Sequence, residues 1–81
     1  MPYIGRGETA MNFSVRLKEL RQSKNLTQKQ MADQFGQSVR AYQYYESGER
    51  YPEFLHLIAL ADFFDVSLDY LVGRSDVKER R

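Results

Sequence analysis

The sequence of 81 residues contains no cysteine, no tryptophan and only two prolines. Without cysteine the chain forms neither disulfides nor thiolate metal sites, and nothing in it indicates an oxidising compartment. No segment reaches the roughly 18 apolar residues that a membrane-spanning helix needs, and the N-terminus lacks the hydrophobic block of a signal peptide. We therefore expect a cytoplasmic protein with one domain and a small core.

Residues for enzymatic chemistry are also scarce. The one histidine, His56, has no evident serine, cysteine or metal partner, and Gly5 and Gly7 alone do not make a phosphate-binding loop. Nothing after Gly73 resembles a sensor domain. The sequence therefore predicts a protein that is not an enzyme and has no metal, no cofactor and no small-molecule effector domain. We expect His56 at the surface or in an interface.

Charged side chains are unevenly distributed, although the net charge is only +1. Residues 12–50 carry seven basic and four acidic side chains, whereas residues 51–72 carry four acidic side chains and no Lys or Arg. Such an asymmetry orients a molecule in the field of a polyanion. Because charged faces of small helical domains are usually just solvated, a nucleic-acid partner needs the support of a motif.

Residues 26–48 predict two short helices joined by a tight turn. Thr27 and Gln30 have the spacing of a capping box, in which each side chain accepts a backbone N–H of the other, so a helix begins directly after Thr27. Gly36 supplies the left-handed residue that ends this helix, and Ser38 offers the N-cap of the next. Two helices connected over so short a turn make a helix-turn-helix.

The second helix of this motif has an inward and an outward face. Tyr42 and Tyr45 are three residues apart and face inward, and Gly48 closes the helix. The outward stripe points at solvent and is the expected reading face for the DNA major groove. It consists of Val39, Arg40, Gln43 and Tyr44.

Three further helices flank the motif. Apolar side chains at helical spacing predict helices over residues 12–25, 52–64 and 68–72. Pro52 opens the second of these, the longest in the chain, because proline suits the first turn of a helix, and Ser67 caps the third. No segment alternates well enough to be a strand. We therefore predict an all-α compact bundle of five helices.

The bundle occupies residues 12–73 and leaves a tail at each end. Residues 1–11 have two glycines, a proline and no periodicity, which predicts a flexible extension. Residues 74–81 carry four basic side chains and predict a solvated, disordered end, with phosphate contacts or the start of a linker as the alternatives.

The helix over residues 52–64 carries two apolar lines. The line that suffices to face the core comprises Phe54, Leu57, Ile58, Ala61 and Phe64. The second line comprises Leu55, Ala59 and Phe63. Since a surface helix of a monomer rarely carries both, we expect the last helix or a subunit interface to bury the second line. Cover by Tyr3 and Ile4, or simple exposure, are the alternatives.

Three segments of the sequence resemble the Cro and phage-repressor type of helix-turn-helix regulators, the XRE family. They read RLKELRQSKNLTQKQMA, YESGERYP and DVSLDYLVG, and the resemblance extends from Asn12 to Gly73. It implies a five-helix bundle and a transcriptional regulator. The implied mode of action is repression, by a homodimer bound to a partly palindromic operator in double-stranded DNA.

The resemblance also implies roles for single residues. Val39, Arg40, Gln43 and Tyr44 match the positions that face the major groove. Arg40 has the donors for guanine and Gln43 has the groups for adenine, whereas Val39 and Tyr44 suit a thymine methyl. The alternatives are that Arg40 touches only phosphate and that Tyr44 packs on its own helix.

Other positions are expected to contact the DNA backbone. Gln28 matches a glutamine that holds a phosphate and braces the recognition helix, and an amide at a helix start suits a phosphate oxygen. Lys29, Ser38 and Arg50, in or beside the motif, are the other expected phosphate contacts.

The same resemblance implies an internal ion pair between Arg21 and Glu46, which would tie the first helix to the third. Two positions depart from the family pattern. Gln37 stands where an aliphatic residue is common, and Tyr42 stands where Ile or Val is common. The Tyr42 hydroxyl therefore needs a partner or access to water.

A homodimer would place its two recognition helices about 34 Å apart along the duplex. The candidates for the dimer contact are Leu55, Phe63, Tyr70 and Val72. Control of the regulator would then come from its synthesis, its proteolysis or a protein partner such as an antirepressor. The competing hypothesis is a protein-interaction adaptor of the same fold, antitoxin-like or co-activator-like, with incidental DNA binding. An adaptor, however, has no need for Arg40 and Gln43 beside Gln28.

Overall fold

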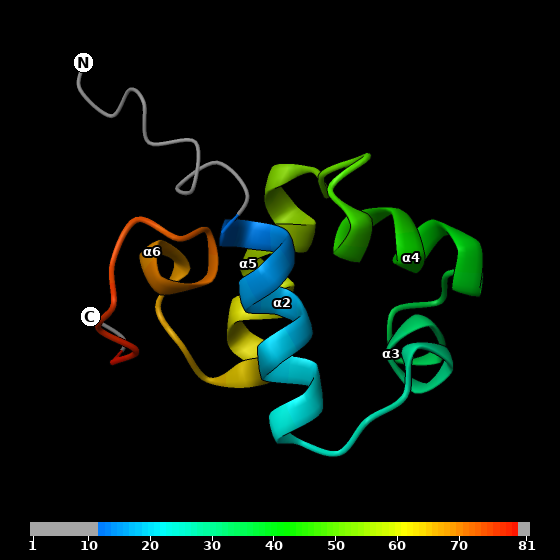
Figure 1. Ribbon diagram of the computed structural model, residues 1–81, viewed down its shortest axis with the longest axis horizontal. Helices are drawn as coiled ribbons and strands as arrows, with labels where there is room; N and C mark the ends of the chain where they lie inside the picture. Colours follow the sequence, from blue (N-terminus) through cyan, green and yellow to red (C-terminus); the bar gives the residue numbers. More distant parts are fainter. Residues whose placement is uncertain (1–11, 80–81) are drawn as a thin grey trace.

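The computed structural model describes residues 12–79, which form five helices and no strand (Figure 1). The predicted all-α architecture is therefore confirmed. The helices are α2 (Asn12–Ser23), α3 (Gln28–Gln34), α4 (Val39–Ser47), α5 (Phe54–Phe64) and α6 (Leu68–Leu71). Within the described range, no helix has the length and apolar character needed to cross a membrane. The expectations for residues 1–11, including cover by Tyr3 and Ile4, lie outside the described residues.

Helix α2 runs through the middle of the molecule, with α3 and α4 on one side and α6 on the other (Figure 1). Each helix contributes one large, fully buried side chain to a shared core, and burying such a side chain stabilises the fold by about 1.5–3 kcal/mol. These side chains are Leu17, Met31, Tyr42, Leu60 and Leu71. The core thus holds the two ends of the molecule in one body.

The predicted caps fix the two helices of the motif. The backbone N–H of Gln30 donates to Thr27 Oγ1 at 3.0 Å, and the backbone N–H of Thr27 donates to Gln30 Oε1 at 2.8 Å, which confirms the capping box. Gly36 is left-handed, with φ of +66°. Ser38 Oγ accepts the Ala41 amide at 3.1 Å and caps α4. Local hydrogen bonds therefore set the short turn between α3 and α4.

Helix α5 begins later than predicted. Pro52 is buried just before the helix, and Glu53 takes the N-cap position. Its 11 residues also make α5 shorter than the 12-residue α2, so the prediction that it is the longest helix is wrong. Proline suits this place as well as the first turn, because its fixed φ favours extended backbone too.

The two apolar lines of α5 are not buried as predicted. Phe54 is 62% exposed in the uncovered first turn of the helix, whereas Leu60 is fully buried. Leu55 is 71% exposed, so α6 does not bury the second line as a whole. Phe63, by contrast, packs edge to face on Phe35 and Phe64, with ring centroids 5.6 Å and 5.0 Å apart. The apolar surplus is thus concentrated at the start of α5.

The described part of the tail is docked as far as Lys78, a contact that the expectation of a solvated end did not include, and residues 80–81 lie outside the described residues. The Ser67 amide donates to the Lys78 carbonyl at 2.8 Å, and Ser67 Oγ donates to the Val77 carbonyl at 3.2 Å. Arg16 of α2 donates to the Tyr70 carbonyl at 2.9 Å and lies 3.9 Å from the centre of the Tyr70 ring. Local sequence composition could not reveal these contacts, because Arg16 and the tail are far apart in the chain.

Candidate nucleic-acid interface

Helix α4 presents a polar face to solvent. Arg40 and Gln43 are exposed on it, and Tyr44 is half-buried. Val39 is half-buried and packs against the hydrophobic core, so the expectation that it points at solvent is only partly right. Its place in the first turn of α4, directly after the turn from α3, leaves only part of the side chain accessible.

Tyr44 joins two arginines on this face. Arg40 Nε donates to Tyr44 Oη at 3.3 Å, and the Arg50 guanidinium lies 4.6 Å from the centre of the Tyr44 ring. Arginine over an aromatic face is a favourable cation–π contact. Tyr44 therefore holds one arginine of the expected reading face and one at the edge of the motif close together.

A second set of contacts braces the face from α3. Gln43 Nε2 donates to Gln28 Oε1 at 3.1 Å, and Gln28 Nε2 donates to Glu46 Oε1, also at 3.1 Å. Each amide oxygen keeps a second lone pair, and each amide nitrogen a second hydrogen. Gln28 and Gln43 can therefore contact DNA while they remain bonded to each other.

Glu46 is the buried end of this network. Arg21 Nε donates to Glu46 Oε2 at 2.6 Å and Arg21 Nη2 to Oε1 at 3.2 Å, so the two residues form a two-point ion pair between α2 and α4. The Tyr42 hydroxyl donates to Glu46 Oε2 and thus has the partner that its burial demands. Arg21 also donates to the Leu26 carbonyl at 2.7 Å, which ties down the connection between α2 and α3.

The electrostatics of this cluster favour the ion pair. Burial by itself would raise the pKa of Glu46, but hydrogen bonds from Arg21, Tyr42 and Gln28 and the Arg21 charge lower that pKa below its ordinary value. The hydrogen bond to Glu46 raises the pKa of Arg21. Burial and, to a smaller extent, the hydrogen bond to the Glu46 carboxylate raise the pKa of Tyr42. Glu46 is therefore ionised at neutral pH and unavailable to a ligand.

The remaining expected phosphate contacts lie around this face. Lys29 is exposed and pairs with Asp33 at 3.0 Å, a surface ion pair that exchanges readily for a phosphate. Ser38 is exposed and uses its Oγ as the α4 cap, which leaves the hydroxyl hydrogen for a further acceptor.

Two side chains beside the interface have unexpected surroundings. His56 is half-buried and contacts the rings of Phe35 and Tyr45, with ring centroids 5.0 Å and 5.5 Å away, so it lies only partly at the surface and its place in an interface stays a prediction. Burial lowers the pKa of His56, and Glu53 partly offsets this effect. Gln37 Nε2 donates to Tyr45 Oη at 3.0 Å, whereas Gln37 Oε1 is buried without a hydrogen-bond partner among residues 12–79.

The four dimer candidates do not form one exposed patch. Leu55 is exposed, whereas Phe63, Tyr70 and Val72 are half-buried against the core of their own chain. Across residues 12–79, no group of histidine and acidic side chains is arranged to hold a metal ion.

Helices α3 and α4, each with a side-chain N-cap and joined by a short turn, form a helix-turn-helix, and hydrogen bonds from α3 support the polar face of α4. The helix-turn-helix family matches residues 17–71, and the chain belongs to this family. The regulators of this family that are described below are named as transcriptional regulators, a class that is not enzymatic.

Particular relatives agree with this class. YqaE, an uncharacterized HTH-type transcriptional regulator of Bacillus subtilis, is 48% identical over 67 residues, or 82% of this chain and 58% of the relative. RstR, the cryptic phage CTXphi transcriptional repressor of Vibrio cholerae, is 44% identical over 64 residues, or 79% and 57%. BcrR, an HTH-type transcriptional activator of Enterococcus faecalis, is 39% identical over 67 residues, or 83% and 33%.

The chain spans only part of the length of these relatives, from 33% to 58%. The shared segment includes the helix-turn-helix described above. No solved structure gives a significant match to the chain.

Proposed function

We propose that this chain is a repressor that binds a partly palindromic operator as a homodimer, with α4 in the major groove. The observation that carries the proposal is the pair of exposed side chains Arg40 and Gln43, each held by a neighbour that can itself contact DNA. Side chains held in place before binding lose less conformational entropy when they bind.

Each part of the interface has a role in this proposal. Arg40 donates two hydrogen bonds to a guanine and Gln43 pairs with an adenine, while Tyr44 and the accessible part of Val39 pack on thymine methyl groups. The phosphate contacts position the protein and carry no sequence information. These contacts come from Gln28, Lys29, Ser38 and Arg50.

The homodimer has one well-exposed candidate contact. Leu55 is 71% exposed and Phe54 beside it is 62% exposed, so the start of α5 offers apolar surface to a second copy. Phe63, Tyr70 and Val72 can contribute only their accessible edges. A contact of this small size between two monomers makes DNA binding depend steeply on protein concentration. The amount of protein alone can therefore switch a gene in the cytoplasm.

Repression is proposed because the protein offers a DNA-reading surface that can block an operator by occupancy. One of the named relatives is a repressor and another is an activator. A reporter gene placed behind the selected operator tests the direction of control, since repression lowers expression when the protein is produced. A rise in expression would contradict the proposed repression without affecting DNA binding.

The test of DNA binding is repeated selection from a randomised duplex library, followed by titration of the selected site at two salt concentrations. We expect a two-fold symmetric site, and a loss of about 1–3 kcal/mol for Arg40→Ala with relaxed preference at one position in each half-site. The matched control is Arg74→Ala, which removes an exposed arginine outside the interface. Equal effects of the two substitutions, or no selected site, would contradict base reading by Arg40.

The stoichiometry is tested separately by sedimentation of the protein with the selected duplex. Two chains per operator are expected, and Leu55→Lys should reduce this to one while the isolated protein stays folded. One wild-type chain per operator would contradict the homodimer.

A further inference from the structure

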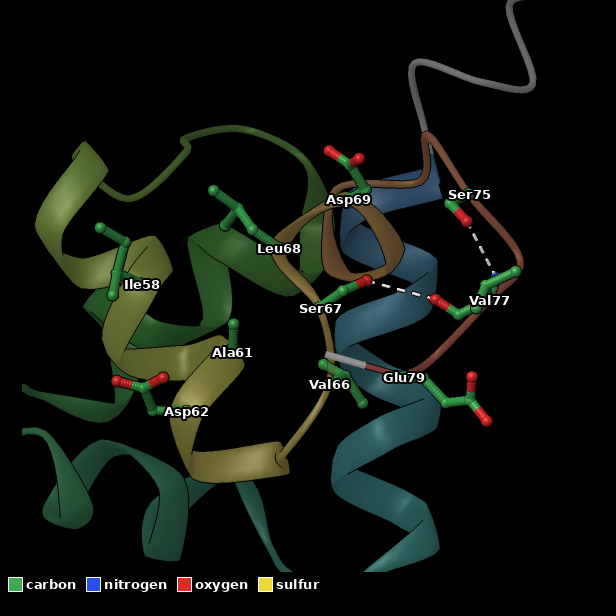
Figure 2. Close-up of a pocket in the computed structure, with 10 residues that line it drawn as sticks. All are labelled: Ile58, Ala61, Asp62, Val66, Ser67, Leu68, Asp69, Ser75, Val77 and Glu79. Carbon is green, nitrogen blue, oxygen red and sulfur yellow. Dashed lines mark hydrogen bonds between the residues drawn. The ribbon is translucent and has the colours of Figure 1, made fainter. Parts of the chain in front are cut away.

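A cavity of about 500 Å³ is lined by residues of α5, α6 and the docked tail (Figure 2). Helix α6 lies across α2 from α3 and α4 (Figure 1). The volume of the cavity is in the range of pockets that bind ligands in proteins. Half of the ten described residues that line the cavity are apolar. They are Ile58, Ala61, Val66, Leu68 and Val77.

Three carboxylates surround this apolar lining. Asp62 comes from α5, Asp69 from α6 and Glu79 from the tail, and Figure 2 shows them on three sides of the cavity. The described residues that line the cavity include no Lys or Arg. The cavity therefore favours an occupant that combines an apolar group with positive charge and disfavours a polyanion such as DNA.

Hydrogen bonds hold the wall that the tail contributes. Ser67 anchors Val77 and Lys78 through their carbonyls, and Ser75 Oγ accepts the Val77 amide at 2.9 Å (Figure 2). Arg16 donates to the Ser75 carbonyl at 3.2 Å. Because three of these contacts tie the tail to Ser67 and Arg16, the tail wall of the cavity is in place without a partner.

We propose that this cavity is the docking site for a short basic segment of a partner protein. An aliphatic side chain of the segment enters the cavity, and neighbouring Lys or Arg side chains pair with Asp69 and Glu79, which are both exposed. The segment from residue 51 to residue 72, which supplies the α5 and α6 walls, carries four acidic side chains and no Lys or Arg, and the basic tail residues Arg74 and Lys78 do not line the cavity. The partner could dock while α4 lies in the major groove, a consequence that rests on the proposed function.

The docking site is tested by selecting a library of random peptides on the intact chain and synthesising the enriched peptide. We expect it to contain Lys or Arg next to Leu, Ile or Val. When it is titrated into the ¹⁵N-labelled protein, the amide signals of Ile58, Leu68 and Val77 should shift. Enriched peptides without basic residues, or shifts confined to α3 and α4, would overturn the proposal.

Charge substitutions locate the site. Glu79→Lys should weaken peptide binding roughly tenfold or more, and Val77→Arg, on the cavity wall, should do the same. Glu19→Lys makes the same change of charge at an exposed position of α2 and should leave peptide affinity unchanged. An equal loss in this control would mean that the peptide responds only to net charge, which overturns the proposal.

Two further measurements separate docking at the cavity from misfolding of the variants and from self-association. Circular dichroism of each variant should match that of the wild type, and their affinities for the selected operator should be retained. If the wild type binds no operator but the peptide results hold, the proposed function fails and the docking site stands. If the cavity signals shift with protein concentration in the absence of peptide, the occupant is a second copy of this chain, and the partner-protein proposal is overturned.

Discussion

The two ends of the molecule are each anchored by an arginine of α2, but they are built differently. Arg21 pairs with Glu46, whose side chain is only 4% exposed, whereas Arg16 contacts Asp76, whose side chain is 101% exposed. At the α3–α4 end, side chains hold other side chains in place. At the α5–α6 end, side chains mainly hold backbone carbonyls of α6 and of the tail. One end thus fixes the positions of the side chains that we propose to contact DNA, and the other fixes the wall of a cavity.

The largest effect is expected from removing the buried carboxylate. Glu46→Ala leaves Arg21 and Tyr42 buried without their shared partner, and such a loss typically destabilises a protein by about 3–5 kcal/mol. Urea unfolding followed by circular dichroism measures the change. Asp76→Ala is the control at the opposite end and should leave the unfolding midpoint unchanged, because water solvates that carboxylate fully. Similar unfolding midpoints for the two variants would show that the two ion pairs contribute equally to stability.

Arg16→Ala is expected to have a smaller and more local effect. It removes hydrogen bonds to two carbonyls and the contact with the Tyr70 ring, a loss of about 1–3 kcal/mol. The amide of Ser67, which donates to the Lys78 carbonyl, should exchange its hydrogen faster, while DNA affinity is retained. Lys18→Ala on the same helix is the matched control. Unchanged exchange at Ser67 would show that Arg16 does not hold the tail.

Tyr44→Phe tests whether the reading face depends on side chains that position one another. The substitution keeps the ring under Arg50 but removes the hydroxyl that accepts from Arg40, so operator affinity should fall by about 0.5–1.5 kcal/mol with little change in stability. Tyr51→Phe removes a hydroxyl from a side chain that is 59% exposed and serves as the control. Equal affinities of the two variants would assign Tyr44 to packing alone.

Local signals explain what the sequence could predict. The caps at Thr27, Ser38 and Ser67 and the left-handed Gly36 and Gly48 depend on neighbours within a few residues, and all appear in the structure. Periodicity likewise predicted five helices.

Contacts between distant segments explain what the sequence could not predict. The exposure of Phe54, the docking of the tail on Arg16 and the contacts of His56 with two rings depend on which helices meet in space. For the candidate site, the types of side chain could be predicted, but the use of Tyr44 to hold two arginines could not, because Arg50 lies beyond the end of α4.

The smallest expected effect is a pH dependence that originates at the α3–α4 end. Because burial lowers the pKa of His56, the folded state binds a proton less readily than the unfolded state. The stability due to neutral His56 is therefore complete above about pH 6.5, the ordinary histidine pKa, and is lost as the pH falls through the lower folded value. The stability due to ionised Glu46 changes with pH in the same direction, but it is lost only near the lower pKa of a carboxyl group.

Unfolding measured between neutral and mildly acidic pH therefore isolates His56, and His56→Phe, which keeps a ring between Phe35 and Tyr45, should flatten the decline in stability. A decline that persists in this variant would place its origin outside the ring cluster.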